Sequence, residues 1–198
     1  MIGIVDYGMG NLRSVEKALE YVGCPAFISG DATRLARADK LVLPGVGAFR
    51  DAIATLRETG LAELIVRAVQ AGTPTLGICL GMQLLFDVSY ENGEYQGLGL
   101  LPGRIVRLPD TVKVPHIGWN SLRILQREPL FAGLPEEPYV YFVHSYYLKT
   151  EAPVVSAVCD YGTVVQAAAQ RDNLFAVQFH PEKSGDVGLR ILKNFGGL

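Results

Sequence analysis

Residues 75–86 read TLGICLGMQLLF: a short apolar run, then the turn Gly-Ile-Cys-Leu-Gly, then a second apolar run. The first run predicts a buried strand, and the second predicts a helix carrying Leu84, Leu85 and Phe86. A cysteine between a strand and a helix, with a glycine two residues away on each side, is typical of the sharp turn that exposes a nucleophile. The N-terminus of the following helix favours a thiolate there. We therefore interpret Cys79 as a nucleophile, with a buried structural cysteine as the alternative.

The alternation of strands and helices extends from this turn back to the N-terminus. Short apolar runs predict strands, and apolar residues that recur every three or four positions predict helices. Strands that alternate with helices indicate a parallel sheet with right-handed crossovers. The predicted strands are 2–7, 26–28, 41–43 and 75–78, and the predicted helices are 12–22, 48–58 and 61–71.

Beyond Asp87 the pattern changes to short strands separated by turns, with a polar loop at 91–94 and a last helix from Val187 to Phe195. No repeat or linker divides the chain, so we predict a single α/β domain over residues 1–198. We expect a mostly parallel central sheet with helices on both faces and an additional antiparallel part in the second half. The segments expected as strands in that half are 103–108, 112–125, 139–148, 154–158, 163–169 and 174–180.

The composition excludes several classes of protein. The 198 residues are 49% hydrophobic and 19% charged with a net charge of −2, which is incompatible with a disordered chain. The basic residues are scattered, so we expect neither nucleic-acid nor membrane binding. No apolar stretch approaches the roughly 20 residues of a membrane helix, and the N-terminus lacks the features of a signal peptide. With three widely spaced cysteines and no disulfide framework, we expect a cytoplasmic protein.

Motifs for other cofactors are incomplete or absent. Gly8 and Gly10 open a dinucleotide-binding pattern, but Arg13 stands where the third glycine is needed. There is no phosphate-binding loop, and no CxxC or HxxxH pair with metal-ligand spacing. We therefore expect no metal and no cofactor. Cys24 and Cys159 lack the setting of Cys79 and are assigned to structure.

A thiol at neutral pH needs a base, because only a few per cent of it is ionised. His180 lies at the end of an apolar run and two residues before Glu182, so in extended chain both side chains share a face. A carboxylate at that place fixes the tautomer of the ring and stabilises its charged form. A surface ion pair is the alternative, and the sequence does not show whether Cys79 and His180 meet.

Two backbone segments are candidates for binding an oxyanion. The N–H of Leu80 directly follows the nucleophile. The loop from Pro44 to Phe49 follows a predicted strand, contains two glycines, and lies at the carboxyl edge of the sheet where ligands bind. The N–H of Val46 or Gly47 is therefore the candidate second donor. An ordinary strand–helix loop is the alternative.

These motifs together resemble those of the class I glutamine amidotransferases. The resemblance is carried by GICLGMQ at residues 77–83 and by QFHPE at residues 178–182, and it extends from residue 6 to residue 195. It implies a flavodoxin-like, class I glutamine amidotransferase fold. Within the family, four further stretches resemble the glutaminase subunits of imidazole glycerol phosphate synthases, in histidine biosynthesis. They are DYGMGNLRSV at 6–15, PGVGAF at 44–49, PHIGWN at 115–120 and YFVHSY at 141–146.

The resemblance implies a reaction and a partner. Cys79 would attack the side-chain amide of glutamine to form a thioester, and water would release glutamate. The ammonia would pass to a separate cyclase subunit, a (β/α)8 barrel, which makes imidazole glycerol phosphate and aminoimidazole carboxamide ribotide. The residues expected to hold glutamine are Gly47, Gln83, Ser145 and Tyr146. The candidates for the interface with the cyclase are Asn11, Trp119, Tyr141 and Lys183, with core packing as the alternative for Trp119 and Tyr141.

Three other functions remain open. The chain could be a glutaminase for anthranilate or guanylate synthesis, although Val46-Gly47 and the Gly-Trp-Asn element around Trp119 count against this. It could be a flavodoxin-like binding domain with an inert cysteine, which a glutamine-mimicking electrophile would leave unmodified. It could also be a cysteine peptidase or γ-glutamyl hydrolase, which should act without any partner.

Overall fold

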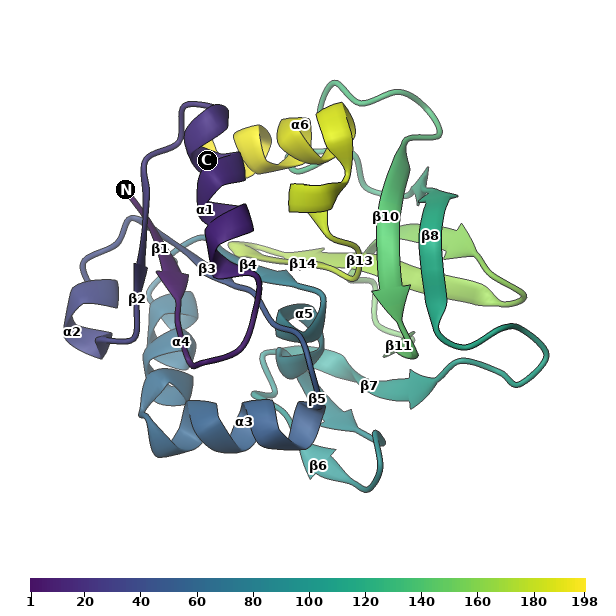
Figure 1. Cartoon of the computed structure of the whole chain (residues 1–198), viewed down its shortest axis with the longest axis horizontal. Helices are drawn as coiled ribbons and strands as arrows, with labels where there is room; N and C mark the ends of the chain where they lie inside the picture. Colours follow the sequence, from purple (N-terminus) through teal and green to yellow (C-terminus); the bar gives the residue numbers. More distant parts are fainter.

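A computed structural model describes the whole chain, residues 1–198, and contains a sheet of twelve strands with helices packed against it (Figure 1). One end of this sheet is parallel, as expected for strands that alternate with helices. Four of its strands come from the first half of the chain, and the fifth comes from the C-terminal region. In spatial order they are β2 (Ala26–Ser29), β1 (Ile2–Val5), β3 (Lys40–Leu43), β4 (Thr75–Ile78) and β14 (Leu174–Val177).

The other end of the sheet is mostly antiparallel, in agreement with the pattern beyond Asp87. It is joined to β14 through an antiparallel neighbour, and a separate two-stranded ribbon stands beside it (Figure 1). The ribbon consists of β8 (His116–Ser121) and β10 (Tyr139–His144). The remaining strands are β5 (Phe86–Ser89), β6 (Tyr95–Gln96), β7 (Leu101–Arg107), β9 (Arg123–Ile124), β11 (Tyr146–Lys149), β12 (Val155–Asp160) and β13 (Val164–Arg171).

Helices cover both faces of the parallel strands, which confirms the predicted architecture. On one face lie α1 (Leu12–Tyr21) and α6 (Gly185–Gly196), and on the other lie α3 (Phe49–Glu58) and α4 (Leu61–Gln70) (Figure 1). Successive side chains of a strand point to opposite faces of the sheet, so each strand contributes residues to the hydrophobic core on both faces. Val42 packs with the α1 and α6 side, whereas Leu41 and Leu43 pack with the α3 and α4 side. No helix combines the length and hydropathy that crossing a lipid bilayer requires.

The structure differs from the sequence-based expectation directly after the turn at Cys79. The helix there, α5 (Leu80–Leu84), is short, and Phe86 begins strand β5 instead of continuing the helix. The carbonyl of Leu84 accepts the N–H of Leu98, and that of Leu85 accepts the N–H groups of Leu100 and Leu101. A segment further along the chain thus satisfies the bonds that a longer helix would have made. The segment 139–148 is also divided, because Ser145 separates β10 from β11 and the two strands join different sheets.

The turn at Cys79 depends on the absence of side chains at its two glycines. A Cβ atom on Gly81 would lie 1.8 Å from the carbonyl oxygen of Leu43, and one on Gly77 would lie 2.8 Å from the carbonyl oxygen of Gly81. Cys79 itself has φ 56, a left-handed conformation that is strained for a residue with a side chain. The close approach of β3, β4 and α5 therefore holds Cys79 at the corner of the turn.

Replacing Gly81 by alanine is expected to lower the free energy of unfolding by about 1–3 kcal/mol, because the methyl group overlaps fixed backbone. The control is Gly197→Ala, where the new Cβ would meet its nearest atoms at 3.5 Å. Denaturant unfolding of both variants measures the difference. Equal stability of the two variants would show that the turn is not tightly packed.

Candidate active site

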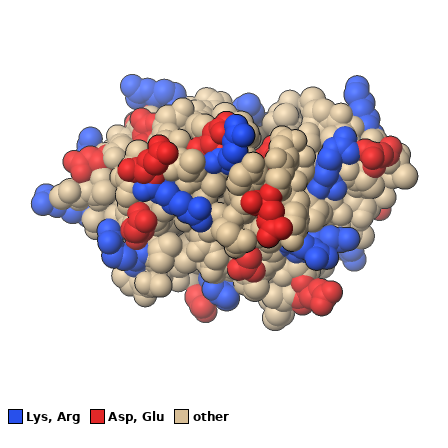
Figure 2. Space-filling view, turned by 90° about the horizontal axis from the view of Figure 1, so that it is seen from below, with Lys and Arg blue, Asp and Glu red and all other residues tan.

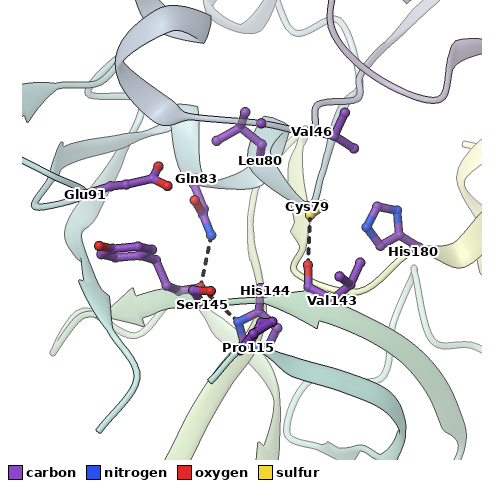
Figure 3. A pocket seen from close by; sticks show the side chains of 12 residues that line it. Val46, Cys79, Leu80, Gln83, Glu91, Pro115, Val143, His144, Ser145 and His180 are labelled. Atoms are coloured by element: carbon purple, nitrogen blue, oxygen red, sulfur yellow. Dashed lines mark hydrogen bonds between the residues drawn. The ribbon is translucent and has the colours of Figure 1, made fainter. Parts of the chain in front are cut away.

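Cys79 opens into a pocket of about 340 Å³ at the carboxyl edge of the parallel strands (Figure 3). This volume suits a ligand the size of an amino acid. The cysteine is largely buried, with its sulfur 4.0 Å from the carbonyl oxygen of Val143. The residues that line the pocket are Val46, Gly47, Cys79, Leu80, Gln83, Glu91, Pro115, Val143, His144, Ser145, Tyr146 and His180.

The structure brings His180 to Cys79 through the pairing of β14 with β4. Val177 lies opposite Ile78 in this parallel ladder, so the residues that follow the two strands are neighbours. The Nδ1 atom of His180 lies 2.8 Å from Oε1 of Glu182, and both side chains are almost completely buried. The alternative of a surface ion pair is therefore wrong. Glu182 reaches the ring from a short 3-10 turn, η1 (Pro181–Lys183), and not from extended chain.

The His180 ring is held in one tautomer with its second nitrogen free. Because Glu182 accepts the proton of Nδ1, the free Nε2 atom is the one available to exchange a proton with the sulfur. Burial lowers the pKa of His180, but the neighbouring Cys79 sulfur and the Glu182 carboxylate outweigh it and raise the pKa to about 10. The two neighbours therefore favour the charged form of the His180 ring.

One of the predicted oxyanion donors, the N–H of Leu80, is engaged within the protein. The N–H of Leu80 donates to the carbonyl oxygen of Gly45 at 3.3 Å, which corrects the expectation that it points toward the reacting carbonyl. The turn before Val46 is held by the hydroxyl of Tyr7, which donates to the carbonyl of Pro44 at 2.9 Å. Gly47 has φ 100, a conformation that favours glycine. In this conformation the site has no complete oxyanion hole.

The pocket is lined by all four residues expected to hold glutamine: Gly47, Gln83, Ser145 and Tyr146. The amide nitrogen of Gln83 is fully used within the protein, donating to the Tyr146 carbonyl at 3.1 Å and to Oε1 of Gln178 at 2.9 Å. A ligand therefore meets the carbonyl end of Gln83.

Glu91 is a pocket residue that sequence reasoning missed. Its Oε2 atom accepts the N–H of Phe49 at 2.8 Å, so the carboxylate caps helix α3 from a residue 42 positions further along the chain. The only signal in the sequence was its place in the polar loop at 91–94, which did not distinguish it from other surface acids. The loop fold brings one acidic side chain to the pocket (Figure 3).

Two further histidines, His116 and His144, form a buried pair, of which His144 lines the pocket. Nδ1 of His116 lies 3.0 Å from Nε2 of His144, and Nδ1 of His144 lies 2.9 Å from the Tyr146 carbonyl. The His116 ring stacks on Tyr161 with centroids 3.8 Å apart. Burial lowers the pKa of His116 and of His144 to about 4, so both rings are neutral at pH 7. The pair supports the Tyr146 segment and does not titrate with His180.

The proposed interface residues lie on the surface near the pocket. Trp119 is 56% exposed, so core packing, the alternative interpretation for this residue, is wrong. Tyr141 is half-buried and meets Trp119 edge-on, with centroids 6.1 Å apart. Lys183 is exposed, and Asn11 is partly exposed at the start of α1.

Comparison with known proteins agrees with this geometry. The family model described as glutamine amidotransferase class-I matches residues 3–196, and the chain belongs to that family. One solved structure, a glutamine amidotransferase, is 21% identical with a TM-score of 0.78 over 100% of this chain and 99% of that one. Another, PurLQS from Thermotoga maritima, is 21% identical with a TM-score of 0.78 over 98% and 96%. Both show the fold alone.

Close relatives define the subfamily. The chain is 59% identical to imidazole glycerol phosphate synthase subunit HisH of Geobacillus thermodenitrificans, over 100% of this chain and 96% of the relative. It is 56% identical to the HisH subunit of Syntrophotalea carbinolica, over the full length of both. The chain is thus a member of the HisH subfamily of glutamine amidotransferases, which confirms the resemblance found in the sequence. The three other functions considered for the sequence are not supported.

The neutral histidine pair predicts acid sensitivity. Between about pH 6.5 and pH 4 the unfolded chain binds protons at His116 and His144 that the folded chain does not, so the free energy of unfolding should fall as the pH is lowered. His180, with its raised pKa, contributes stability that is complete below pH 6.5 and is lost as the pH rises through about 10.

Denaturant unfolding at pH 7 and at about pH 4.5 measures this acid effect. The matched control is the variant His116→Gln/His144→Gln, which retains the carboxylates that also respond to acid. Its unfolding free energy should change less with pH than that of the wild type. Parallel pH dependences in the two proteins would contradict the assignment of two neutral buried rings.

Proposed function

We propose that Cys79, His180 and Glu182 carry out the glutamine hydrolysis of this amidotransferase, and that the ammonia goes to a cyclase subunit. The observation that carries the proposal is the buried His180–Glu182 pair beside a cysteine held in a strained turn. Strained turns and perturbed ionisable groups cluster at catalytic sites. The pocket of about 340 Å³ next to the sulfur leaves room for glutamine.

The reaction follows from the positions of these groups. His180 Nε2 takes the proton of the Cys79 thiol, and the thiolate attacks the side-chain amide carbon of glutamine. The tetrahedral intermediate then collapses, and His180 gives the proton to the departing nitrogen, which leaves as ammonia. Water, activated by His180, hydrolyses the γ-glutamyl thioester to glutamate and restores the thiol. Glu182 holds the ring in the tautomer that both steps need and stabilises its charged form.

The engaged N–H of Leu80 suggests how the activity is restrained. The peptide unit between Gly45 and Val46 is planar, so its carbonyl oxygen and its N–H point in opposite directions. Rotating this unit by about half a turn would move the Gly45 oxygen away from the Leu80 N–H and bring the Val46 N–H to the place that the oxygen had occupied. The same rotation would free one oxyanion donor and supply a second. A single such donor is worth about 10²–10³ in rate, so the conformation described here is a resting state with weak activity.

Glutamine would be oriented by groups at the far end of the pocket. Its α-ammonium group needs an acceptor, and the Glu91 carboxylate is the acidic side chain in the lining. Gly47, Gln83, Ser145 and Tyr146 surround the rest of the amino acid. These contacts would place the side-chain amide against the sulfur.

The names of the relatives identify them as subunits of a synthase, and we infer that a cyclase subunit with a (β/α)8 barrel docks here as a heterodimer in the cytoplasm. The exposed face of the β8–β10 ribbon supports the inference that the cyclase docks there. Ile117 and Trp119 are both more than half exposed and pair across the ribbon with Val143 and Tyr141. Since Val143 also lines the pocket, this apolar face leads from the sulfur to the surface.

The face of the molecule seen in Figure 2 gives no reason to propose another type of macromolecular partner. Figure 2 shows acidic and basic side chains interspersed over the face in view, without a broad area of one sign. A nucleic acid or an anionic membrane would require a continuous basic surface.

Release of glutamate from glutamine tests the proposed reaction. The isolated chain should release glutamate slowly, and the cyclase subunit with its nucleotide ligand should stimulate it about 10²-fold or more, as expected if oxyanion donors become available. Cys79→Ala should abolish release with and without the partner. High activity of the isolated chain would contradict the proposed resting state, and an active Cys79→Ala variant would eliminate the thioester mechanism.

The interface is tested by Trp119→Ala. Truncation of a central interface tryptophan costs about tenfold or more in affinity, so the variant should need a correspondingly higher cyclase concentration for half-maximal stimulation. The matched control is Tyr21→Ala, because Tyr21 is also aromatic, is 80% exposed, and lies at the other end of α1 from Asn11. Equal titration curves for the two variants would place the partner elsewhere.

A further inference from the structure

Gln178 is a buried side chain that the mechanism has not used. It directly follows β14, and the register that pairs Val177 with Ile78 puts it beside Cys79. Its residue is fully buried, and its main-chain N–H is already satisfied by the carbonyl of Ala167 at 2.8 Å. Burying an amide away from water is costly unless each polar atom has a partner, so its side-chain contacts define what it does.

A chain of hydrogen bonds decides which way the Gln178 amide points. The carbonyl of Tyr146 can only accept, so the atom of Gln83 that faces it must be the nitrogen. The same nitrogen lies 2.9 Å from the Gln178 side chain, which must therefore present its oxygen. The Gln178 nitrogen is then left facing the Cys79 sulfur, at 3.9 Å. The opposite orientation would set two nitrogens against each other and an oxygen against the sulfur.

The sulfur needs such a donor when it ionises. In the thiol form its proton can be directed at the Val143 carbonyl oxygen, 4.0 Å away (Figure 3). Once the proton has moved to His180, that carbonyl oxygen repels the thiolate, because both atoms carry negative charge. The Gln178 amide is a neutral donor on the sulfur whose position does not change during the proton transfer.

We propose that Gln178 is a further catalytic residue, whose side-chain amide donates a hydrogen bond to the Cys79 sulfur and stabilises its thiolate. The proposal rests on the proposed role of Cys79 as the nucleophile. Gln83 has a second role in it, because its amide nitrogen holds Gln178 in the donating orientation. The wall that binds glutamine and the nucleophile are in this way parts of one hydrogen-bonded network.

The test is the pH dependence of Cys79 alkylation by iodoacetamide, which needs neither glutamine nor the cyclase. Gln178→Met removes the donor and keeps a side chain of similar length. We expect the alkylation rate at pH 7 to fall about tenfold and the pH–rate profile to move to higher pH, as for the loss of a hydrogen bond to a charged group. The measurements use a Cys24→Ala background, because Cys24 is partly exposed.

Two further variants keep the test decisive. Gln178→Glu preserves the size of the side chain and places a carboxylate against the sulfur, so it should move the profile further in the same direction. Gln166→Met is the matched control. The side chain of Gln166 makes two hydrogen bonds with the main chain of Thr150, directly after β11, and none with the sulfur. This control variant should change the free energy of unfolding at most, and the pH–rate profile of Cys79 alkylation should be the same as in the wild type.

The outcomes separate this inference from the proposed function. An unchanged profile in folded Gln178→Met and Gln178→Glu, measured alongside the unfolding free energy, would reduce Gln178 to a packing role. If Cys79→Ala at the same time abolishes glutamate release, the proposed function still stands. Glutamate release by Cys79→Ala would instead remove the basis of both.

Discussion

The parallel pairing of β4 with β14 is the interaction on which the rest of the site depends. It joins a strand from the middle of the chain to one near its end, in the register that sets Val177 opposite Ile78. Because parallel strands end at the same edge of a sheet, this register puts Gln178 and His180 beside Cys79. A shift by one residue would turn their side chains to the opposite face.

Burial lowers the pKa of both histidines that line the pocket, but their neighbours make the net shifts opposite. His180 has charged or polarisable neighbours in Cys79 and Glu182, and its pKa is raised to about 10. His144 is buried with a neutral ring and a carbonyl as partners, and its pKa is lowered to about 4. The same residue type thus supplies a proton carrier at one place and an uncharged support at another. In the proposed mechanism the proton is exchanged between Cys79 and His180 and does not involve His144.

The site is assembled in every part except the one that stabilises the intermediate. The proposed nucleophile, base and carboxylate, Cys79, His180 and Glu182, are in place, whereas the Leu80 N–H is engaged with Gly45. The turn whose rotation we propose is held by Tyr7 and joins a pocket that is also lined by Val143 and His144 of the β8–β10 ribbon. A partner that covers this ribbon therefore has a physical route to the oxyanion turn, which suits an enzyme whose ammonia is needed only when an acceptor is bound.

The alternating strands and helices, the turn at Cys79 and the pairing of His180 with Glu182 could all be predicted from the amino-acid sequence. These features depend on glycine spacing, apolar periodicity and contacts two residues apart, all of which are local. Four features could not be predicted in this way: Gln178 faces the sulfur, Glu91 enters the pocket, α5 stops before Phe86, and the Leu80 N–H is occupied. Each of these depends on a partner at least fourteen residues away in the chain, which local patterns do not encode.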